Sequence, residues 1–146
     1  MTTPLQSVRY TAEATASNFG RDGCVRIAES DIALDLAKPP GMGGRTNDAG
    51  ANPEQLFAAG YAACFHGALL FHARAEGIDV EGSHVTARVS IGPIDGGGLG
   101  LAVELWVRLP GLDEAVATKL TDTAHEACPY SRATRGNIEV AVTIDS

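Results

Sequence analysis

The chain has 146 residues, of which 45% are hydrophobic and 20% are charged, and its formal net charge is −7. This length suits one domain with a core of its own, and the composition excludes intrinsic disorder. The negative charge repels nucleic-acid phosphates and anionic lipids, and the 11 Lys and Arg form no basic run that could offset it. We therefore expect a single domain over residues 1–146 that binds neither nucleic acid nor membrane.

The cellular compartment is predicted from the apolar segments and the cysteines. The first fifteen residues contain no stretch apolar enough for a secretory signal, and the apolar run at 56–71 is shorter than a membrane span. We therefore expect a cytoplasmic protein. In that reducing compartment a pair among the three cysteines is more often catalytic, redox-sensing or metal-binding than structural.

Alternating apolar and polar residues predict three strands near the start of the chain, at residues 5–16, 25–28 and 32–37. The turn between the first two contains Gly20 and Gly23, and both can take positive φ angles. The three strands suit an antiparallel meander. Segment 38–51 is rich in Pro and Gly, and we interpret it as a functional or mobile loop inside the domain.

A long apolar helix is predicted from residue 53 to about residue 75. Asn52 is a suitable N-cap, and Pro53 suits the first helical position. Between residues 56 and 71 only His66 is clearly polar, so the helix should be covered on every side. A single small domain cannot cover it alone, so we expect a partner subunit.

The rest of the chain predicts three strands and one more helix. The strands cover residues 83–91, 100–109 and 137–144, and the glycine-rich segment PIDGGGLG joins the first two as in a hairpin. The helix covers 113–128, ends at Pro129 and presents on one face Val116, Leu120, Ala124 and Cys128. The element order βββ-α-ββ-α-β predicts an α+β domain in which mainly antiparallel sheets surround two buried helices.

Two cysteines stand in different surroundings. Cys64 lies in the apolar helix, where a thiol is inert unless a cation is near, so alone it would be interpreted as a small core residue. Cys128 lies at the end of the other helix, on its apolar face. A dithiol that reduces peroxides needs a second thiol to capture the sulfenic acid formed on the first. The pair is therefore a candidate redox site.

Three motifs carry a resemblance to a known family. NPEQLFAAGYAACF surrounds Cys64, CPYSRATRGNIEV begins at Cys128, and GRDG covers residues 20–23. Over nearly the whole chain these residues resemble the organic hydroperoxide resistance (Ohr) proteins of the OsmC/Ohr superfamily. The resemblance implies the OsmC/Ohr fold and an intertwined homodimer.

The resemblance also implies an activity and its residues. It makes Cys64 the peroxidatic and Cys128 the resolving cysteine, and it maps the family's arginine and glutamate onto Arg21 and Glu54. Arg21 would hold Cys64 as thiolate, and Glu54 would orient the guanidinium. The implied enzyme reduces alkyl or fatty-acid hydroperoxides through a Cys64–Cys128 disulfide, with dihydrolipoamide or a lipoylated protein as the reductant. No bound cofactor or metal is implied.

Helix geometry constrains how these residues can meet. Glu54 and Cys64 are ten residues apart, which is about 15 Å along one straight helix. Either the helix breaks near Gly60, or Glu54 reaches the site from the other subunit together with Arg21. We predict the second arrangement.

Other interpretations stay open. The chain could be a general OsmC-type peroxidase with another substrate preference, or a non-catalytic small-molecule-binding or interaction module. Zinc binding by Cys64, His66, His125 and Cys128 is disfavoured, because Cys64 and His66 point about 200° apart around a helix. Cys24 is interpreted as a bystander and His125 as making a plain polar contact.

The cation and the substrate-binding residues also have alternatives. Arginines that compete with Arg21 for the cationic role are Arg45, Arg132 and Arg135. Residues that could accept the alkyl chain are Leu56, Phe65, Phe71 and Tyr130.

Overall fold

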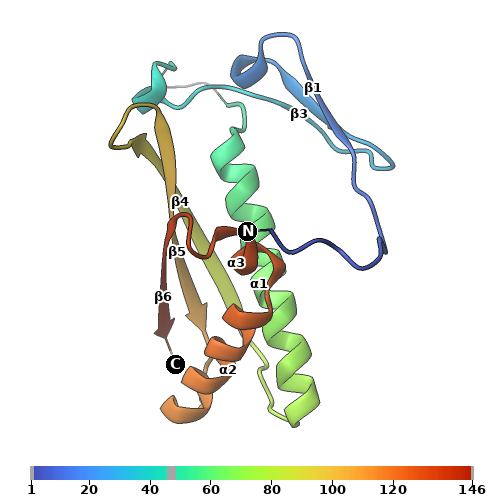
Figure 1. Cartoon of the computed structure of the whole chain (residues 1–146), viewed down its shortest axis with the longest axis vertical. Coiled ribbons are helices and arrows are strands. Elements are labelled where there is room, and N and C mark those ends of the chain that lie inside the picture. The colour runs from blue at the N-terminus through green and yellow to red at the C-terminus, as the bar shows by residue number, and fades with distance from the viewer. Residues whose placement is uncertain (1, 46–48, 146) are drawn as a thin grey trace. The chain divides into compact units, whose positions relative to one another are not determined.

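The structure is a computed structural model that describes residues 2–45 and 49–145 (Figure 1). The chain forms two compact units, Met1–Pro53 and Glu54–Ser146, and each is described by itself. That residues 1–146 form one domain stays a prediction.

The first unit contains an antiparallel sheet of three strands. These are β1 (Ala14–Ser17), β2 (Cys24–Ile27) and β3 (Ala33–Asp35), in the order β1-β2-β3. The predicted meander is confirmed. The first strand, however, does not extend back to residue 5, because residues 5–13 have no strand structure. Leu5 and Val8 are 80% and 68% exposed, so the alternation of apolar residues in this segment faces no core.

The connection from β1 to β2 contains a 3-10 helix, η1 (Gly20–Asp22), which carries Arg21. Gly20 has a φ of 59°, as the sequence predicted. The same prediction is wrong for Gly23, whose φ is −101°. A Cβ atom at Gly23 would lie 2.1 Å from the Ser17 carbonyl oxygen, so the close approach of the backbone requires glycine here.

The segment rich in Pro and Gly is irregular where it is described. It contains a second 3-10 helix, η2 (Pro40–Met42), and Leu36 pairs with Ala51 in an isolated parallel bridge. Residues 46–48 of the predicted loop at 38–51 lie outside the described residues. At the start of the loop, Lys38 Nζ lies 3.1 Å from a carboxylate oxygen of Asp22 in η1.

The long helix α1 (Pro53–Glu76) confirms the predicted apolar helix. It buries one stripe of residues four apart, namely Tyr61, Phe65, Leu69 and Ala73. Within the described part of the second unit, residues 54–145, the expected cover on every side is not present. A second stripe, also four apart, is exposed and consists of Ala59, Ala63, Gly67 and Phe71.

By length and composition alone α1 could cross a membrane, because it extends well beyond the apolar run at 56–71. The sequence prediction that this apolar segment is too short to span a membrane is therefore corrected, because the helix is longer than the apolar run. The finding is weak support for a membrane span, since core helices of soluble proteins pass the same test. The buried stripe of α1 belongs to the core of the second unit, and 22% of the apolar window of α1 is buried in the structure.

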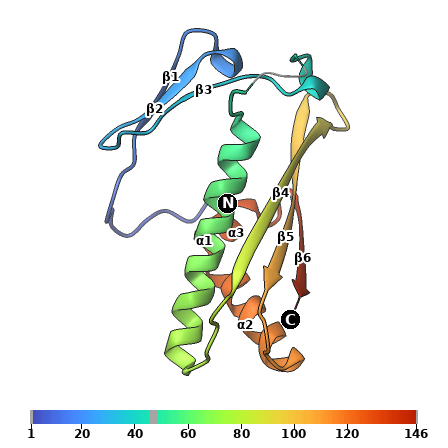
Figure 2. The same ribbon diagram turned by 180° about the vertical axis from the view of Figure 1, so that it is seen from behind.

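The second unit has a sheet of three strands beside α1, in the order β4-β5-β6 (Figure 2). β4 (His84–Pro93) and β5 (Leu99–Arg108) form the predicted antiparallel hairpin. β6 (Glu139–Asp145) pairs with β5 in parallel, which needs a crossover connection. That connection holds α2 (Glu114–Ala127) and a short helix that the sequence did not predict, α3 (Pro129–Thr134).

The core of the second unit lies between this sheet and the helices. On β5, Val103, Leu105 and Val107 are at most 2% exposed, whereas Trp106 on the opposite face is 41% exposed. From α2 the core receives Ala117, Leu120, Ala124 and the adjoining Cys128. The predicted core position of Val116 is wrong, because this side chain is 37% exposed and the neighbouring Ala117 is buried instead.

Candidate active site

Cys64 and Cys128 meet inside the second unit. Their Sγ atoms are 3.6 Å apart, and neither is in a disulfide. Cys128 is fully buried, whereas Cys64 is partly exposed. A disulfide has a sulfur separation of about 2.05 Å, so the two atoms would have to approach by about 1.5 Å. Cys64 is thus the thiol that a solute can reach, and Cys128 is within reach of Cys64.

Cys128 lies between α2 and α3, as the C-cap of the first helix and the N-cap of the second. Its backbone is extended, with φ −61° and ψ 124°, as expected for a residue before proline. Its N–H donates to the Ala124 carbonyl at 2.8 Å, and its carbonyl accepts from the Arg132 N–H at 3.0 Å. Pro129 therefore ends α2 and also begins α3. Both helices fix the backbone that carries the thiol.

The surroundings of Cys64 disfavour its thiolate. Burial raises the pKa of the Cys64 thiol above its ordinary value. The backbone N–H of Tyr130 lowers this pKa, but the neighbouring thiol of Cys128 raises it again, and the net shift is upward. Because only the thiolate is a strong nucleophile, Cys64 needs a nearby positive charge to react at neutral pH.

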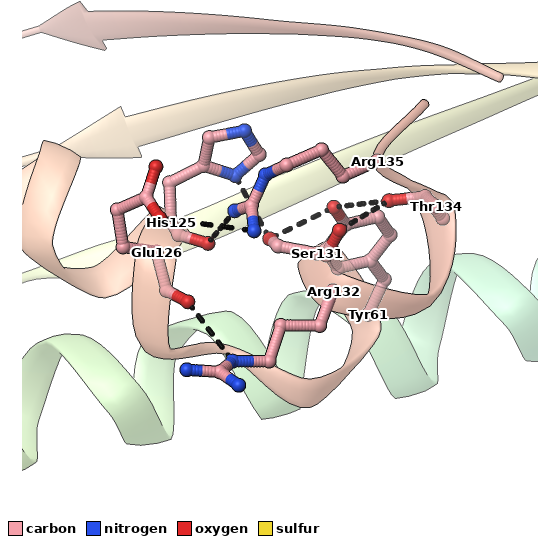
Figure 3. Close-up of polar contacts among 7 residues, drawn as sticks. All are labelled: Tyr61, His125, Glu126, Ser131, Arg132, Thr134 and Arg135. Atoms are coloured by element: carbon pink, nitrogen blue, oxygen red, sulfur yellow. Dashed lines mark hydrogen bonds and ion pairs between the residues drawn. The ribbon is translucent and has the colours of Figure 1, made fainter. Parts of the chain in front are cut away.

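Two of the competing arginines bind the end of α2 instead (Figure 3). Arg132 Nε donates to the Glu126 carbonyl at 3.2 Å, and an Arg135 guanidinium nitrogen donates to the His125 carbonyl at 2.7 Å. Another Arg135 nitrogen lies 3.8 Å from the Glu126 carboxylate. Basic side chains commonly satisfy the last carbonyls of a helix in this way. These contacts account for both side chains without a role at Cys64.

The predicted cation and its partner lie in different units. Arg21 is partly buried in η1, and Glu54 lies in the first turn of α1. α1 is continuous through Gly60, so a break of the helix there is excluded as a way to bring Glu54 to Cys64. Gly60 has another role, because a Cβ atom here would lie 2.9 Å from Tyr130 Oη. The arrangement across two subunits stays a prediction.

Aromatic side chains from α1 and α3 contact each other where the two helices meet. The ring of Tyr130, which is 37% exposed, lies 6.0 Å from that of Phe57. Phe57 was missed in the sequence, because a continuous apolar run does not show which residues face α3. Among the residues predicted to accept an alkyl chain, Leu56 is partly buried and Phe71 is on the exposed stripe. Phe65 is wrong for this role, since it is fully buried in the core.

The remaining candidates make local contacts. Cys24 Sγ, in the first unit, lies 3.1 Å from Ser17 Oγ. His66 Nε2 lies 3.0 Å from Ser83 Oγ, and burial lowers the pKa of His66. Over residues 2–45 and 49–145, no three His, Cys, Asp or Glu side chains gather as metal ligands. An open depression along α2, at Asp113 to Thr123, contains neither Cys64 nor Cys128.

Comparison with known proteins places the chain in a family. The sequence model of the family described as OsmC-like protein matches residues 45–143. The chain belongs to the OsmC family. An organic hydroperoxide resistance protein of Xanthomonas axonopodis pv. citri is 49% identical to this OsmC family member over 142 residues, which are 95% of this chain and 96% of that protein.

Solved structures agree with this membership. The crystal structure of an organic hydroperoxide resistance protein from Elizabethkingia anophelis, with thiocyanate bound, matches 97% of this chain and 99% of its own, with 45% identity and a TM-score of 0.90. A structure from Vibrio cholerae, with captopril in one of its active sites, matches 95% and 94% with 44% identity and a TM-score of 0.87. The OsmC/Ohr fold and the place of this OsmC family member among the organic hydroperoxide resistance proteins are thereby confirmed.

Proposed function

We propose that this protein is a thiol-dependent peroxidase that reduces organic hydroperoxides to alcohols. The 3.6 Å separation between the Sγ atoms of a reachable Cys64 and a buried Cys128 carries the proposal. The name shared by its relatives, organic hydroperoxide resistance protein, supports alkyl or fatty-acid hydroperoxides as the substrate class.

The reaction divides between the two cysteines. The Cys64 thiolate attacks the terminal oxygen of the hydroperoxide, the O–O bond breaks, and the alkoxide takes up a proton to leave as an alcohol. Cys64 becomes a sulfenic acid. The Cys128 sulfur then attacks Cys64 Sγ, so that a disulfide forms and water leaves. Dihydrolipoamide or a lipoylated protein reduces the disulfide and becomes a cyclic disulfide itself, so no bound cofactor is required.

Arg21 and Glu54 are proposed to activate Cys64. The raised pKa of the Cys64 thiol supports the need for a cation, and Arg132 and Arg135 are occupied at the end of α2. A guanidinium would favour the thiolate and donate hydrogen bonds to the peroxide oxygens as charge develops on the alkoxide. Glu54 would fix the plane of the guanidinium. Arg21 is chosen because the GRDG motif resembles the arginine motif of the family.

A homodimer is part of the proposal. The exposed stripe of α1 consists of Ala59, Ala63, Gly67 and Phe71. Three of these four residues are small enough for a second backbone to approach closely, and an isologous contact around a twofold axis would cover the stripe on both copies. We propose that the dimer works in the cytoplasm, where its thiols are kept reduced.

Peroxide consumption tests the proposed activity. We expect tert-butyl hydroperoxide with dihydrolipoamide to be consumed faster than hydrogen peroxide with dihydrolipoamide, and faster than either peroxide with thioredoxin. Cys64→Ser should abolish turnover, Cys128→Ser should oxidise Cys64 without forming the Cys64–Cys128 disulfide, and Cys24→Ser should retain turnover. Equal rates with both peroxides would favour a general OsmC-type peroxidase. No consumption in any pairing, without sulfenic acid or disulfide, would favour a non-catalytic module.

A further inference from the structure

Hydrogen-bonded side chains join α1 to α3 and to the end of α2 (Figure 3). His125 Nδ1 lies 2.8 Å from Ser131 Oγ, and Ser131 Oγ lies 2.9 Å from Tyr61 Oη. Tyr61 Oη lies 3.2 Å from Thr134 Oγ1, which donates to the Tyr130 carbonyl at 3.0 Å. The three hydroxyl-bearing residues are at most 5% exposed, so water does not compete for these bonds. We call this set the hydroxyl chain.

Counting protons gives the hydroxyl chain one direction. A carbonyl can only accept, so the Thr134 hydroxyl proton points to the backbone and Thr134 Oγ1 accepts from Tyr61. Tyr61 Oη therefore accepts from Ser131, and Ser131 Oγ accepts from His125. His125 must carry its proton on Nδ1. Burial and the charge of Arg135 lower the pKa of His125, so the ring is neutral at pH 7 and Nε2 is unprotonated.

The hydroxyl chain links α1, which carries Cys64, to the junction of α2 and α3, which carries Cys128. Tyr61 lies three residues before Cys64 on α1, and Ser131 lies three residues after Cys128 in α3. Their 2.9 Å hydrogen bond therefore connects the two backbones about one helical turn from each sulfur. His125, at the end of α2, holds the Ser131 hydroxyl from the other side. These two contacts fix the junction of α2 and α3 against α1.

We propose that Tyr61, Ser131 and His125 are positioning residues that hold Cys128 within reach of Cys64 for disulfide formation. This inference rests on the proposed function, because it concerns the second chemical step. Neither Tyr61 nor His125 needs to touch the substrate. Their effect acts through the backbone of Cys128.

Two reactions compete for the Cys64 sulfenic acid, and the ratio of their products measures how well Cys128 is positioned. In one, the Cys128 thiol and the Cys64 sulfenic acid form a disulfide and release water. In the other, a second organic hydroperoxide oxidises the sulfenic acid to sulfinic acid and leaves as its alcohol. Only the first reaction depends on the distance between the sulfurs. Loosening the hydroxyl chain should therefore increase the sulfinic acid fraction at a given peroxide concentration.

The first test requires no substitution. Long-range ¹H–¹⁵N NMR of the reduced protein at pH 7.5 reports which nitrogen of His125 carries the proton, and a His125→Gln variant assigns the signals. We expect the Nδ1–H tautomer, although the Nε2–H tautomer is the usual one for a free neutral imidazole. An Nε2–H tautomer would reverse the contact with Ser131 and overturn the proposal.

The second test compares Tyr61→Phe and Ser131→Ala with Thr123→Ala. The control removes a hydroxyl that, among the residues that the structure describes, donates to the Lys119 carbonyl of its own helix at 2.8 Å. After one equivalent of cumene hydroperoxide, we expect disulfide formation to slow about tenfold or more in the first two variants, because small misplacements of reacting groups are costly. Intact-mass spectra should show more sulfinic acid in both, and the control should match the wild type.

The step before disulfide formation distinguishes positioning from general damage. In a Cys128→Ser background, Cys64 should be oxidised at the same rate whether residue 61 is Tyr or is replaced by Tyr61→Phe. The reason is that the Thr134 hydroxyl still donates to the Tyr130 carbonyl in both proteins. Loss of both steps together, or disulfide formation as fast as in Thr123→Ala, would overturn the proposed positioning. Absence of sulfenic acid and disulfide in the wild type would instead overturn the proposed function.

Discussion

At the scale of single residues, Cys64 combines access with low intrinsic reactivity. It is the partly exposed member of the pair, yet burial raises the pKa of its thiol. The N–H of Tyr130 offsets only part of this shift. The second unit therefore places the two sulfurs together but leaves the thiolate to be stabilised by a cation. This is why the proposed role of Arg21 can be tested through the pH dependence of Cys64 alone.

We predict that replacing Arg21 shifts the titration of Cys64 upward. In a Cys24→Ser/Cys128→Ser background, alkylation of Cys64 by iodoacetamide should accelerate as pH rises, because only the thiolate reacts. Arg21→Ala removes a charge that favours the thiolate, so the midpoint should move to higher pH by about one unit or more. Arg45→Ala is the matched control and should leave the midpoint unchanged. An unchanged midpoint in Arg21→Ala would reject this arginine as the activating cation.

At the scale of elements, local signals predicted what depends on local structure. The Asn52-Pro53 start and the apolar run after it indicated α1, and the hairpin of β4 and β5 followed from alternation and a glycine-rich turn. α3 was missed because Pro129 was interpreted only as the end of a helix, while proline is equally suited to begin one. The parallel pairing of β6 depends on tertiary contacts that no local pattern reports.

The candidate site was predictable to the same extent. Two cysteines on the apolar faces of two helices indicated a pair, and their Sγ atoms are 3.6 Å apart. The contact of Tyr61 with Ser131 was not predicted, because it joins residues 70 positions apart. In addition, Tyr61 lies in an apolar run, where its side chain was counted as part of a hydrophobic surface. The buried face of α2 was also predicted one residue out of register, because Ala117 is buried in place of the predicted Val116.

Within α2, a buried hydroxyl gives a prediction for stability. Thr121 is 1% exposed, and its Oγ1 has no hydrogen-bond partner among the residues that the structure describes. Thr121→Val removes this desolvated group, with little change in helix propensity, and should stabilise the fold by about 1 kcal/mol in urea unfolding. Thr123→Val, whose hydroxyl is bonded to Lys119, should not stabilise it. A lower urea midpoint for Thr121→Val would show that its hydroxyl has a partner in solution.

At the scale of the whole molecule, the unbroken α1 links the site to the proposed dimer. Glu54 and Cys64 lie on one continuous helix, about 15 Å apart along its axis, so one copy of α1 cannot bring both to a single pocket. In a dimer, the Glu54 end of one α1 could serve the Cys64 of the other copy. If Arg21 accompanies Glu54, each active site would draw its nucleophile and its cation from different subunits.

Mixing two inactive proteins tests this arrangement. Arg21→Ala lacks the proposed cation and Cys64→Ser lacks the nucleophile, so each homodimer should be inactive. After joint unfolding and refolding of equal amounts, about half of the dimers should be mixed, and each should contain one intact site if the sites are shared between subunits. We therefore expect about a quarter of the wild-type peroxidase activity. If Arg21 acts on Cys64 of its own chain, every site lacks one of the two residues and the mixture should stay inactive. Light scattering on the refolded samples should first show the mass of two 15.1 kDa chains.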